Sequence, residues 1–283
     1  MKLFAVNITN FKIDGGAMFG VVPKVLWEKR YPADENNLCN WALRSLLIDT
    51  GERVVLIDNG FGDKQSDKFM SRFHLNENLG IEKTLENIGY KCEEITDMLI
   101  THLHYDHCGG GVKHDASGNG YELTFPNARY WVGKAQWDSA MNPNSREATS
   151  FLEENLIPMQ RSGKMTLVEE ETELLPELYV RIFNGHTDGQ LIPFIKTGNG
   201  STLVFAADLL PSTAHIPLPY IMSYDMKPEI TLSEKESFLE EAEKNNYTIF
   251  FQHDLYNECC TLQKTRRGIS AGETFLLSDR FNN

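Results

Sequence analysis

Four potential metal ligands stand within six residues of one short segment, residues 101–110, and they are His102, His104, Asp106 and His107. An apolar run over residues 95–100 precedes the segment and is typical of a buried strand, which would give these ligands a rigid backing. Imidazole and carboxylate groups together form a ligand set that divalent metals such as zinc accept. A lone histidine is usually a core or surface residue, but this spacing predicts a metal site.

Three more potential ligands lie where apolar strands are expected to end. His186 follows a strand over 179–183, Asp208 ends an apolar run that begins at 203, and His253 ends another that begins at 249. Singly, a strand-end aspartate often caps a turn and a strand-end histidine is often exposed. Jointly they could complete a centre for two metal ions, because one loop cannot supply every ligand. Of the other histidines, His74 and His114 are expected at the surface, whereas His215 follows Asp208 closely and could belong to the site.

Composition and charge exclude several classes of partner. The net charge of −13, without a block of Lys and Arg, disfavours nucleic acid. No stretch approaches the roughly 20 apolar residues that a membrane helix needs, so we expect no membrane partner. The five cysteines are scattered without CxxC spacing and the N-terminus resembles a strand rather than a signal peptide, which favours the cytoplasm. We expect a small-molecule substrate and a monomer or homodimer.

Hydrophobic periodicity predicts strands on both sides of a central group of helices. We expect a glycine-hinged loop at 14–20, a hairpin formed by 43–49 and 53–58, a turn at 197–201, and a helix opened by a capping box at Ser233 and Glu236. The remaining expected strands are 3–13, 128–132, 166–168, 179–183, 191–196, 202–206 and 248–252, and the remaining helices are 64–75, 81–88, 134–141 and 150–160. Without a linker, this order predicts a single domain, 1–283, of the α/β (α+β) class with four αββα layers.

The ligand pattern resembles the metallo-β-lactamase superfamily over residues 43–254. Its HxHxDH motif is matched in full by residues 102–107, and its later histidine, aspartate and histidine by His186, Asp208 and His253. The resemblance implies the αββα fold and two divalent ions, one bound by His102, His104 and His186 and the other by Asp106, His107 and His253. Asp208 would bridge them. Zinc is the expected metal, although iron, manganese or cobalt would suit the same ligands.

Within that superfamily, the loop at 14–20 and the Gly-His-Thr element look like the N-acyl homoserine lactonases. Two departures stand out: Asp188 replaces a common proline, and Pro211 stands where those enzymes have a catalytic tyrosine. The resemblance implies a quorum-quenching type of hydrolase in which a metal-bridging hydroxide opens a lactone or related ester. We expect Asp106, a ligand close to that hydroxide, to carry its proton to the leaving oxygen. We rank His215 and Tyr220 ahead of Tyr105 and Tyr224 as the group that stabilises the substrate oxygen.

The walls of the substrate pocket and the exact reaction stay open at this point. The expected pocket residues, which could equally pack the core, are Met18, Phe19, Val21, Tyr105, Ile216 and Leu218. A thioesterase, a phosphodiesterase or an organophosphate esterase would use the same metal ligands. A di-iron redox protein is a weaker alternative, because such proteins typically have a glutamate where this chain has His104.

Overall fold

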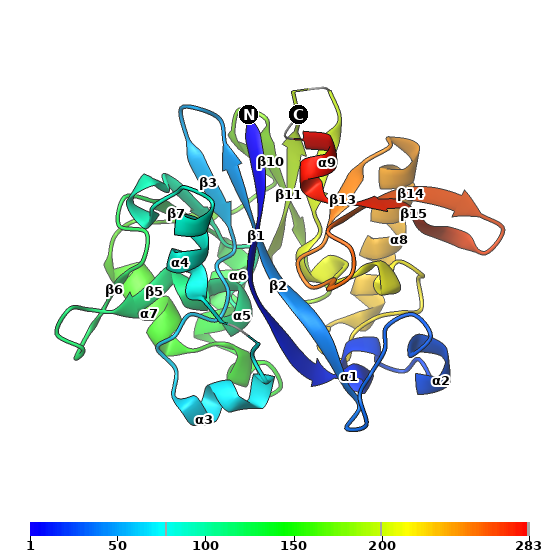
Figure 1. Ribbon diagram of the computed structural model, residues 1–283, viewed down its shortest axis with the longest axis horizontal. Coiled ribbons are helices and arrows are strands. Elements are labelled where there is room, and N and C mark those ends of the chain that lie inside the picture. The colour runs from blue at the N-terminus through cyan, green and yellow to red at the C-terminus, as the bar shows by residue number, and fades with distance from the viewer. Residues whose placement is uncertain (77, 199, 282–283) are drawn as a thin grey trace.

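Two large sheets lie face to face with helices outside them in the computed structural model, which describes residues 1–76, 78–198 and 200–281 (Figure 1). The six-stranded sheet has the order β1-β2-β3-β4-β7-β8, and its strands are β1 (Lys2–Asp14), β2 (Leu38–Asp49), β3 (Val54–Ile57), β4 (Asp97–Leu99), β7 (Arg129–Gly133) and β8 (Met165–Val168). β1, β2 and β3 pair antiparallel, whereas β3, β4, β7 and β8 run parallel.

The seven-stranded sheet has the order β15-β14-β13-β12-β11-β10-β9. Its strands are β9 (Thr172–Leu175), β10 (Leu178–Phe183), β11 (Gln190–Lys196), β12 (Thr202–Phe205), β13 (Thr248–Phe250), β14 (Cys259–Thr265) and β15 (Gly268–Phe275). A small hairpin is formed by β5 (Val112–His114) and β6 (Tyr121–Leu123). The helices are α1 (Gly15–Phe19), α2 (Lys24–Trp27), α3 (Asp67–Met70), α4 (Gly80–Asn87), α5 (Tyr105–Cys108), α6 (Lys134–Met141), α7 (Glu153–Arg161), α8 (Pro228–Lys244) and α9 (Leu277–Phe281).

Both faces of the six-stranded sheet are buried, because successive side chains of a strand point to opposite faces. In β2, Leu46 and Ile48 join the core shared with the second sheet, while Leu47 between them packs in the cluster with α4, α6 and α7. On the other sheet, α8 covers the outer face, with Phe238 set edge to face against Phe183 and Phe194. Figure 1 shows the resulting layers, with α4 and α7 on one side and α8 on the other. This confirms the predicted αββα fold.

Most of the predicted elements are present within a few residues. The hairpin prediction is confirmed, since β2 and β3 pair antiparallel with Leu46 opposite Ile57. β11 and β12 also pair antiparallel, although Asn199 in the expected turn lies outside the described residues. The predicted loop at 14–20 is instead helix α1, whose N-terminus is capped by the Asp14 side chain accepting from Ala17 N at 2.8 Å. Gly20 follows it with φ 57°, and a Cβ there would lie 2.5 Å from Ile221 O.

Two predicted helix boundaries were also wrong, and the last two strands were not predicted. The helix expected at 64–75 is shortened to α3, because the buried Lys64 extends its side chain to Val112 O and Ser66 caps the helix only at Asp67. Ser233 does not cap α8, which begins at Pro228, a residue that is preorganised for the first helical position. Strands β14 and β15 extend the sheet beyond the last predicted strand. No helix in the described part of the chain is long and apolar enough to cross a membrane.

Candidate metal centre

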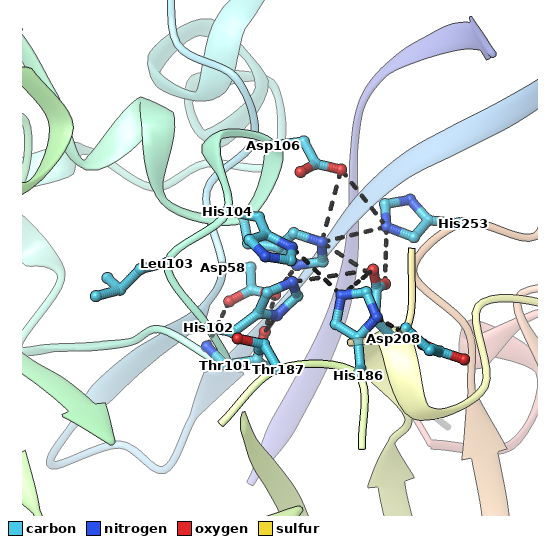
Figure 2. Close-up of polar contacts among 12 residues, drawn as sticks. Asp58, Thr101, His102, Leu103, His104, Asp106, His186, Thr187, Asp208 and His253 are labelled. Atoms are coloured by element: carbon cyan, nitrogen blue, oxygen red, sulfur yellow. Dashed lines mark hydrogen bonds and ion pairs between the residues drawn. The ribbon is translucent and has the colours of Figure 1, made fainter. Parts of the chain in front are cut away.

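The seven predicted ligands come from four separate segments and lie close together. Figure 2 labels six of them, His102, His104, Asp106, His186, Asp208 and His253. His102 and His104 lie between β4 and α5, and α5 itself carries Asp106 and His107. His186 follows β10, while Asp208 and His253 follow the parallel neighbours β12 and β13. Since parallel strands end at the same edge of a sheet, Asp208 and His253 emerge side by side.

Two backbone features aim these segments at one another. β12 ends at Phe205, earlier than predicted, and Asp208 lies in a short 3₁₀ turn, Ala207–Leu209. Ala207 adopts φ 40°, a left-handed conformation that costs a non-glycine residue about 1–2 kcal/mol. After the motif, a Cβ on Gly109 would lie only 2.1 Å from Phe61 O. The glycine therefore allows the motif loop to pack against the segment that follows β3.

The Asp208 carboxylate lies between two groups of histidines. Its Oδ2 atom is 3.2 Å from His186 Nε2 and 3.9 Å from His102 Nε2. Its Oδ1 atom is 3.2 Å from His253 Nε2 and 3.6 Å from His107 Nε2. Asp106 lies beside the pair His107 and His253, and its Oδ2 atom is 3.6 Å from His107 Nε2 and 3.9 Å from His253 Nε2. One carboxylate oxygen thus faces each half of the site, as a bridging ligand requires.

Each histidine is held by the ring nitrogen that faces away from Asp208. His107 Nδ1 donates to Asp58 at 2.9 Å, His186 Nδ1 to Asp225 at 2.8 Å, and His104 Nε2 to Glu147 at 3.1 Å. The other two histidines are held by uncharged groups: His253 Nδ1 is hydrogen-bonded to the backbone oxygen of Ala42, and His102 Nδ1 to the Thr101 hydroxyl. Bonds of this kind fix the tautomer and leave the other nitrogen with its lone pair available to a metal.

The donor atoms form sets that fit divalent metal ions. They form three overlapping sets whose atoms all lie within 4.8 Å of one another: His102, His104 and His186; His102, His107 and Asp208; Asp106, His107 and His253. His102 Nε2 is fully buried and has no hydrogen-bond partner in the described part of the chain, which is a costly arrangement unless an ion takes its lone pair. The neutral imidazoles and carboxylates match the preferences of zinc and related metals.

Burial and mutual charge set the protonation of the cluster. Burial holds the pKa of His102 well below its ordinary value, and the neighbouring histidines act in the same direction. Burial also acts to lower the pKa of His107, but the facing carboxylates of Asp106 and Asp208 raise it well above the ordinary value. Burial acts to raise the pKa of Asp208, yet the surrounding histidines hold it well below its usual range. Since metals bind neutral imidazole, uptake of metal would release protons.

Three supporting carboxylates were missed by the sequence analysis. Asp58 directly follows β3, and this strand-end position before Asn-Gly could have signalled a role. Glu147 and Asp225 are 43 and 39 residues from the histidines they bind. No local pattern marks such distant partners.

A cavity of about 150 Å³ opens above the cluster. Its lining includes Asp106, Asp208, His104, His186 and His253 together with an apolar group formed by Phe11, Ile13, Met18, Phe61, Phe73 and Met222. Among the predicted pocket residues, Met18 and Tyr105 line this cavity. Phe19 and Ile216 are buried in the core, Leu218 packs against the core, and Val21 is 98% exposed, so none of these four lines it.

His215 and Tyr220, the first-ranked candidates for binding the substrate oxygen, do not line the cavity either. His215 is 1% exposed, and both of its ring nitrogens are engaged, Nδ1 with Ser212 Oγ at 2.8 Å and Nε2 with Met18 O at 2.9 Å. Its ring stacks on Phe19, and the Tyr220 ring packs against the same phenylalanine. Tyr105 and Tyr224, ranked lower from sequence, are the tyrosines of the described chain that line the cavity.

A sequence profile of the metallo-beta-lactamase superfamily matches residues 44–253, most of the chain and all seven predicted ligands. The protein therefore belongs to the metallo-beta-lactamase superfamily, and it is a metal-dependent hydrolase of that superfamily.

Known relatives agree with this assignment. An N-acyl homoserine lactonase from Bacillus thuringiensis is 24% identical over 233 residues, which cover 78% of this chain and 84% of that protein. A probable metal-dependent hydrolase from Staphylococcus aureus has a similar structure, with a TM-score of 0.86, 31% identity and coverage of 97% of this chain and 98% of that one. AidC, a dizinc quorum-quenching lactonase, shares the fold at a TM-score of 0.80, with 22% identity and coverage of 97% and 95%.

Proposed function

We propose that the protein hydrolyses a lactone or related small-molecule ester with two divalent ions, zinc foremost, held by the seven-residue cluster. The position of Asp208 between two histidine groups at the floor of a partly apolar cavity carries this proposal. The kinship with N-acyl homoserine lactonases supports the lactone class, and the apolar lining suits an acyl chain. Acyl homoserine lactones are accordingly the first substrates to test, with quorum quenching as the proposed consequence.

The chain's own residues would orient the reactants and move a proton. Two divalent cations supply, when bound, an activated water molecule at neutral pH and polarisation of the substrate carbonyl. Asp106 is half-buried and lines the cavity beside His107 and His253. Its carboxylate is placed to accept the proton of the attacking water and to deliver it to the leaving oxygen.

The hydroxyl that binds the substrate oxygen is proposed to be that of Tyr224 rather than His215 or Tyr220. Tyr224 lines the cavity and is 44% exposed. Burial, and then the charge of Asp106, raises the pKa of this phenol to about 12, so that it remains a hydrogen-bond donor at neutral pH. Tyr105 also lines the cavity, but its ring packs against Phe61, Phe69 and Phe73, which makes it part of the apolar wall.

The test compares chelated protein with protein reconstituted with zinc. Lactones of increasing acyl length, thioesters, phosphodiesters and β-lactams should be assayed together with metal content. We expect lactone hydrolysis that disappears on chelation, returns with about two zinc ions per chain, and is lost in His253→Asn. His74→Asn is the matched control, because His74 is exposed and its left-handed backbone (φ 46°) suits asparagine. Preferential hydrolysis of another class, or no hydrolysis with metal bound, would overturn the lactonase proposal.

The roles of Asp106 and Tyr224 are tested by separate variants. Asp106→Asn should lower kcat by about 100-fold or more, the usual effect of removing a general base. Tyr224→Phe should lower kcat/KM while metal content stays unchanged. Wild-type kcat in a fully metal-loaded Asp106→Asn protein would refute the proton-carrying role.

We further propose a cytoplasmic setting, with zinc as the resident metal. The five cysteines are all free and buried, as expected in a reducing compartment. Subcellular fractionation would test the location, and size-exclusion chromatography with light scattering would separate a monomer from a homodimer.

A further inference from the structure

Arg146 is the one lysine or arginine among the described residues that line the cavity. It stands in a turn whose backbone is fixed by Asn144, because Asn144 Oδ1 accepts from Arg146 N at 2.9 Å and from Glu147 N at 3.1 Å. The next residue, Glu147, is buried and holds His104. The same rigid turn therefore supports the metal cluster and presents a cation to the cavity.

The guanidinium of Arg146 has no acidic partner in the described part of the chain. Its Nη2 atom donates to the backbone oxygen of Ser223. Four other arginines have acidic partners: Arg44 lies near Glu258, Arg53 near Asp97, Arg181 near Glu241 and Arg280 near Glu273. A backbone carbonyl satisfies one donor but does not balance the positive charge.

The acids of the cavity are already engaged by histidines. Asp208 lies 3.2 Å from His186 and from His253, Glu147 lies 3.1 Å from His104, and Asp106 lies 3.6 Å from His107. These three acids therefore face the histidine cluster, and none of them forms an ion pair with Arg146 in the described part of the chain. Ser150 and Ser223 also belong to this lining.

We propose that Arg146 is a specificity-determining residue that binds an oxyanion, a carboxylate or a phosphate, carried by the substrate away from the scissile ester. This inference rests on the proposed ester hydrolysis and specifies its substrate class. A guanidinium offers five N–H donors in a planar fork, so the donors left beside the bond to Ser223 O can bind two oxygens of one anion. The substrate would then have an ester or lactone at the cluster, an apolar linker along side chains such as Phe61 and Met222, and an anion at Arg146.

Long-range attraction by the whole protein does not explain such a preference. The net charge of −13 repels anions, so selectivity must come from contact with a local cation. Arg146 is exposed, so we expect its bond to an anionic ligand to be as weak as the weakest charge-assisted hydrogen bonds. The affinity for an anionic ligand should then exceed that for a neutral one by about tenfold. The gain should shrink with added salt.

The kinetic test uses three lactones or esters of equal chain length that end in a carboxylate, a phosphate or a neutral primary amide. In the zinc-loaded enzyme, one or both anionic substrates should exceed the amide by about tenfold in kcat/KM, and the larger ratio identifies the anion. Arg146→Gln should bring that ratio close to one, and Arg146→Lys should restore part of it. Arg72→Gln is the matched control, because Arg72 is exposed but does not line the cavity.

A binding test works whether or not the proposed function is correct. Calorimetry of zinc-loaded protein with a linear dicarboxylate, a phosphorylated monocarboxylate of the same length and the corresponding monoamide should show the same tenfold preference, lost in Arg146→Gln. If Arg146 only ties the turn to Ser223, Arg146→Gln would weaken all ligands equally and leave the ratio intact, which would overturn the proposal. Equal binding of all three ligands by the wild-type protein would also overturn it. If the protein did not hydrolyse lactones but still preferred the anionic ligands, only the lactonase proposal would be refuted.

Discussion

Asp58 offers a sharp perturbation of one half of the cluster. Its buried carboxylate accepts three hydrogen bonds, from Thr101 N at 2.8 Å, Thr101 Oγ1 at 2.7 Å and His107 Nδ1 at 2.9 Å. Its backbone has φ 57°, a left-handed conformation that asparagine adopts as readily as aspartate. The substitution Asp58→Asn therefore removes charge and one acceptor oxygen without straining the chain.

The expected magnitude follows from those three bonds. Asparagine keeps one acceptor oxygen and sets an NH₂ group against a donor, so at least one buried donor loses its partner, at a cost of about 1–3 kcal/mol in the free energy of unfolding. Loss of the acceptor for His107 Nδ1 should also weaken metal binding by about 10–100-fold. Because His107 belongs to the set with Asp106 and His253, the weakening should fall on that metal ion.

Glu147→Gln is the matched variant for the other half of the cluster. Glu147 is also buried and supports His104, which belongs to the set with His102 and His186. Zinc titration against a competing chelator should show one weakened step in each variant, and spectra of cobalt-substituted protein should show that a different site is affected in each. Urea unfolding in the presence of chelator measures the stability change separately.

Two outcomes would contradict these roles of Asp58 and Glu147. If Asp58→Asn bound both zinc ions with the same dissociation constants as the wild-type protein, the Asp58 carboxylate would not support a metal ligand. If both variants lowered the affinity for both ions equally, the two halves of the cluster would not bind separate ions.

Two further predictions concern the packing around the site. Burial lowers the pKa of His215 to about 3, so below about pH 6.5 the unfolded chain binds a proton at this residue and the folded chain does not. The contribution of neutral His215 to the free energy of unfolding is therefore complete above that pH. It falls by about 1.4 kcal/mol for each pH unit below it. With chelator present, the loss of unfolding free energy between pH 7 and pH 5 should be about 2 kcal/mol smaller in His215→Gln than in wild type, and equal losses would contradict the assignment. The buried Lys235 donates to the carbonyls of Pro217, Leu218 and Tyr220 at 2.9, 3.3 and 2.9 Å, so Lys235→Met should lower the unfolding free energy by about 1–3 kcal/mol in urea titrations. The exposed Lys244 on the same helix is the control, and a loss in Lys244→Met as large as that in Lys235→Met would contradict the role of these bonds.

Local sequence predicted much of the fold because periodicity reports burial directly. The apolar runs of β2 and β3, joined by a glycine turn, predicted a hairpin, and its side chains are buried on both faces. At α8 the local pattern was misleading, because the Ser233 capping pattern lies inside the helix and Pro228 begins it. Strands β14 and β15 were not predicted, because their partly exposed residues show a weak apolar pattern.

The sequence by itself determined the identity of the candidate ligands, because HxHxDH concentrates donors in one turn and the later donors stand beyond apolar strands. Only the tertiary structure decided which groups surround them. Asp58, Glu147 and Asp225 reach the histidines across 39 to 49 residues of chain. His215 is sealed in the core, whereas Tyr224 and Arg146 face the cavity. Side-chain pattern fixes which face of an element is buried, but the partners across that face depend on how distant elements pack.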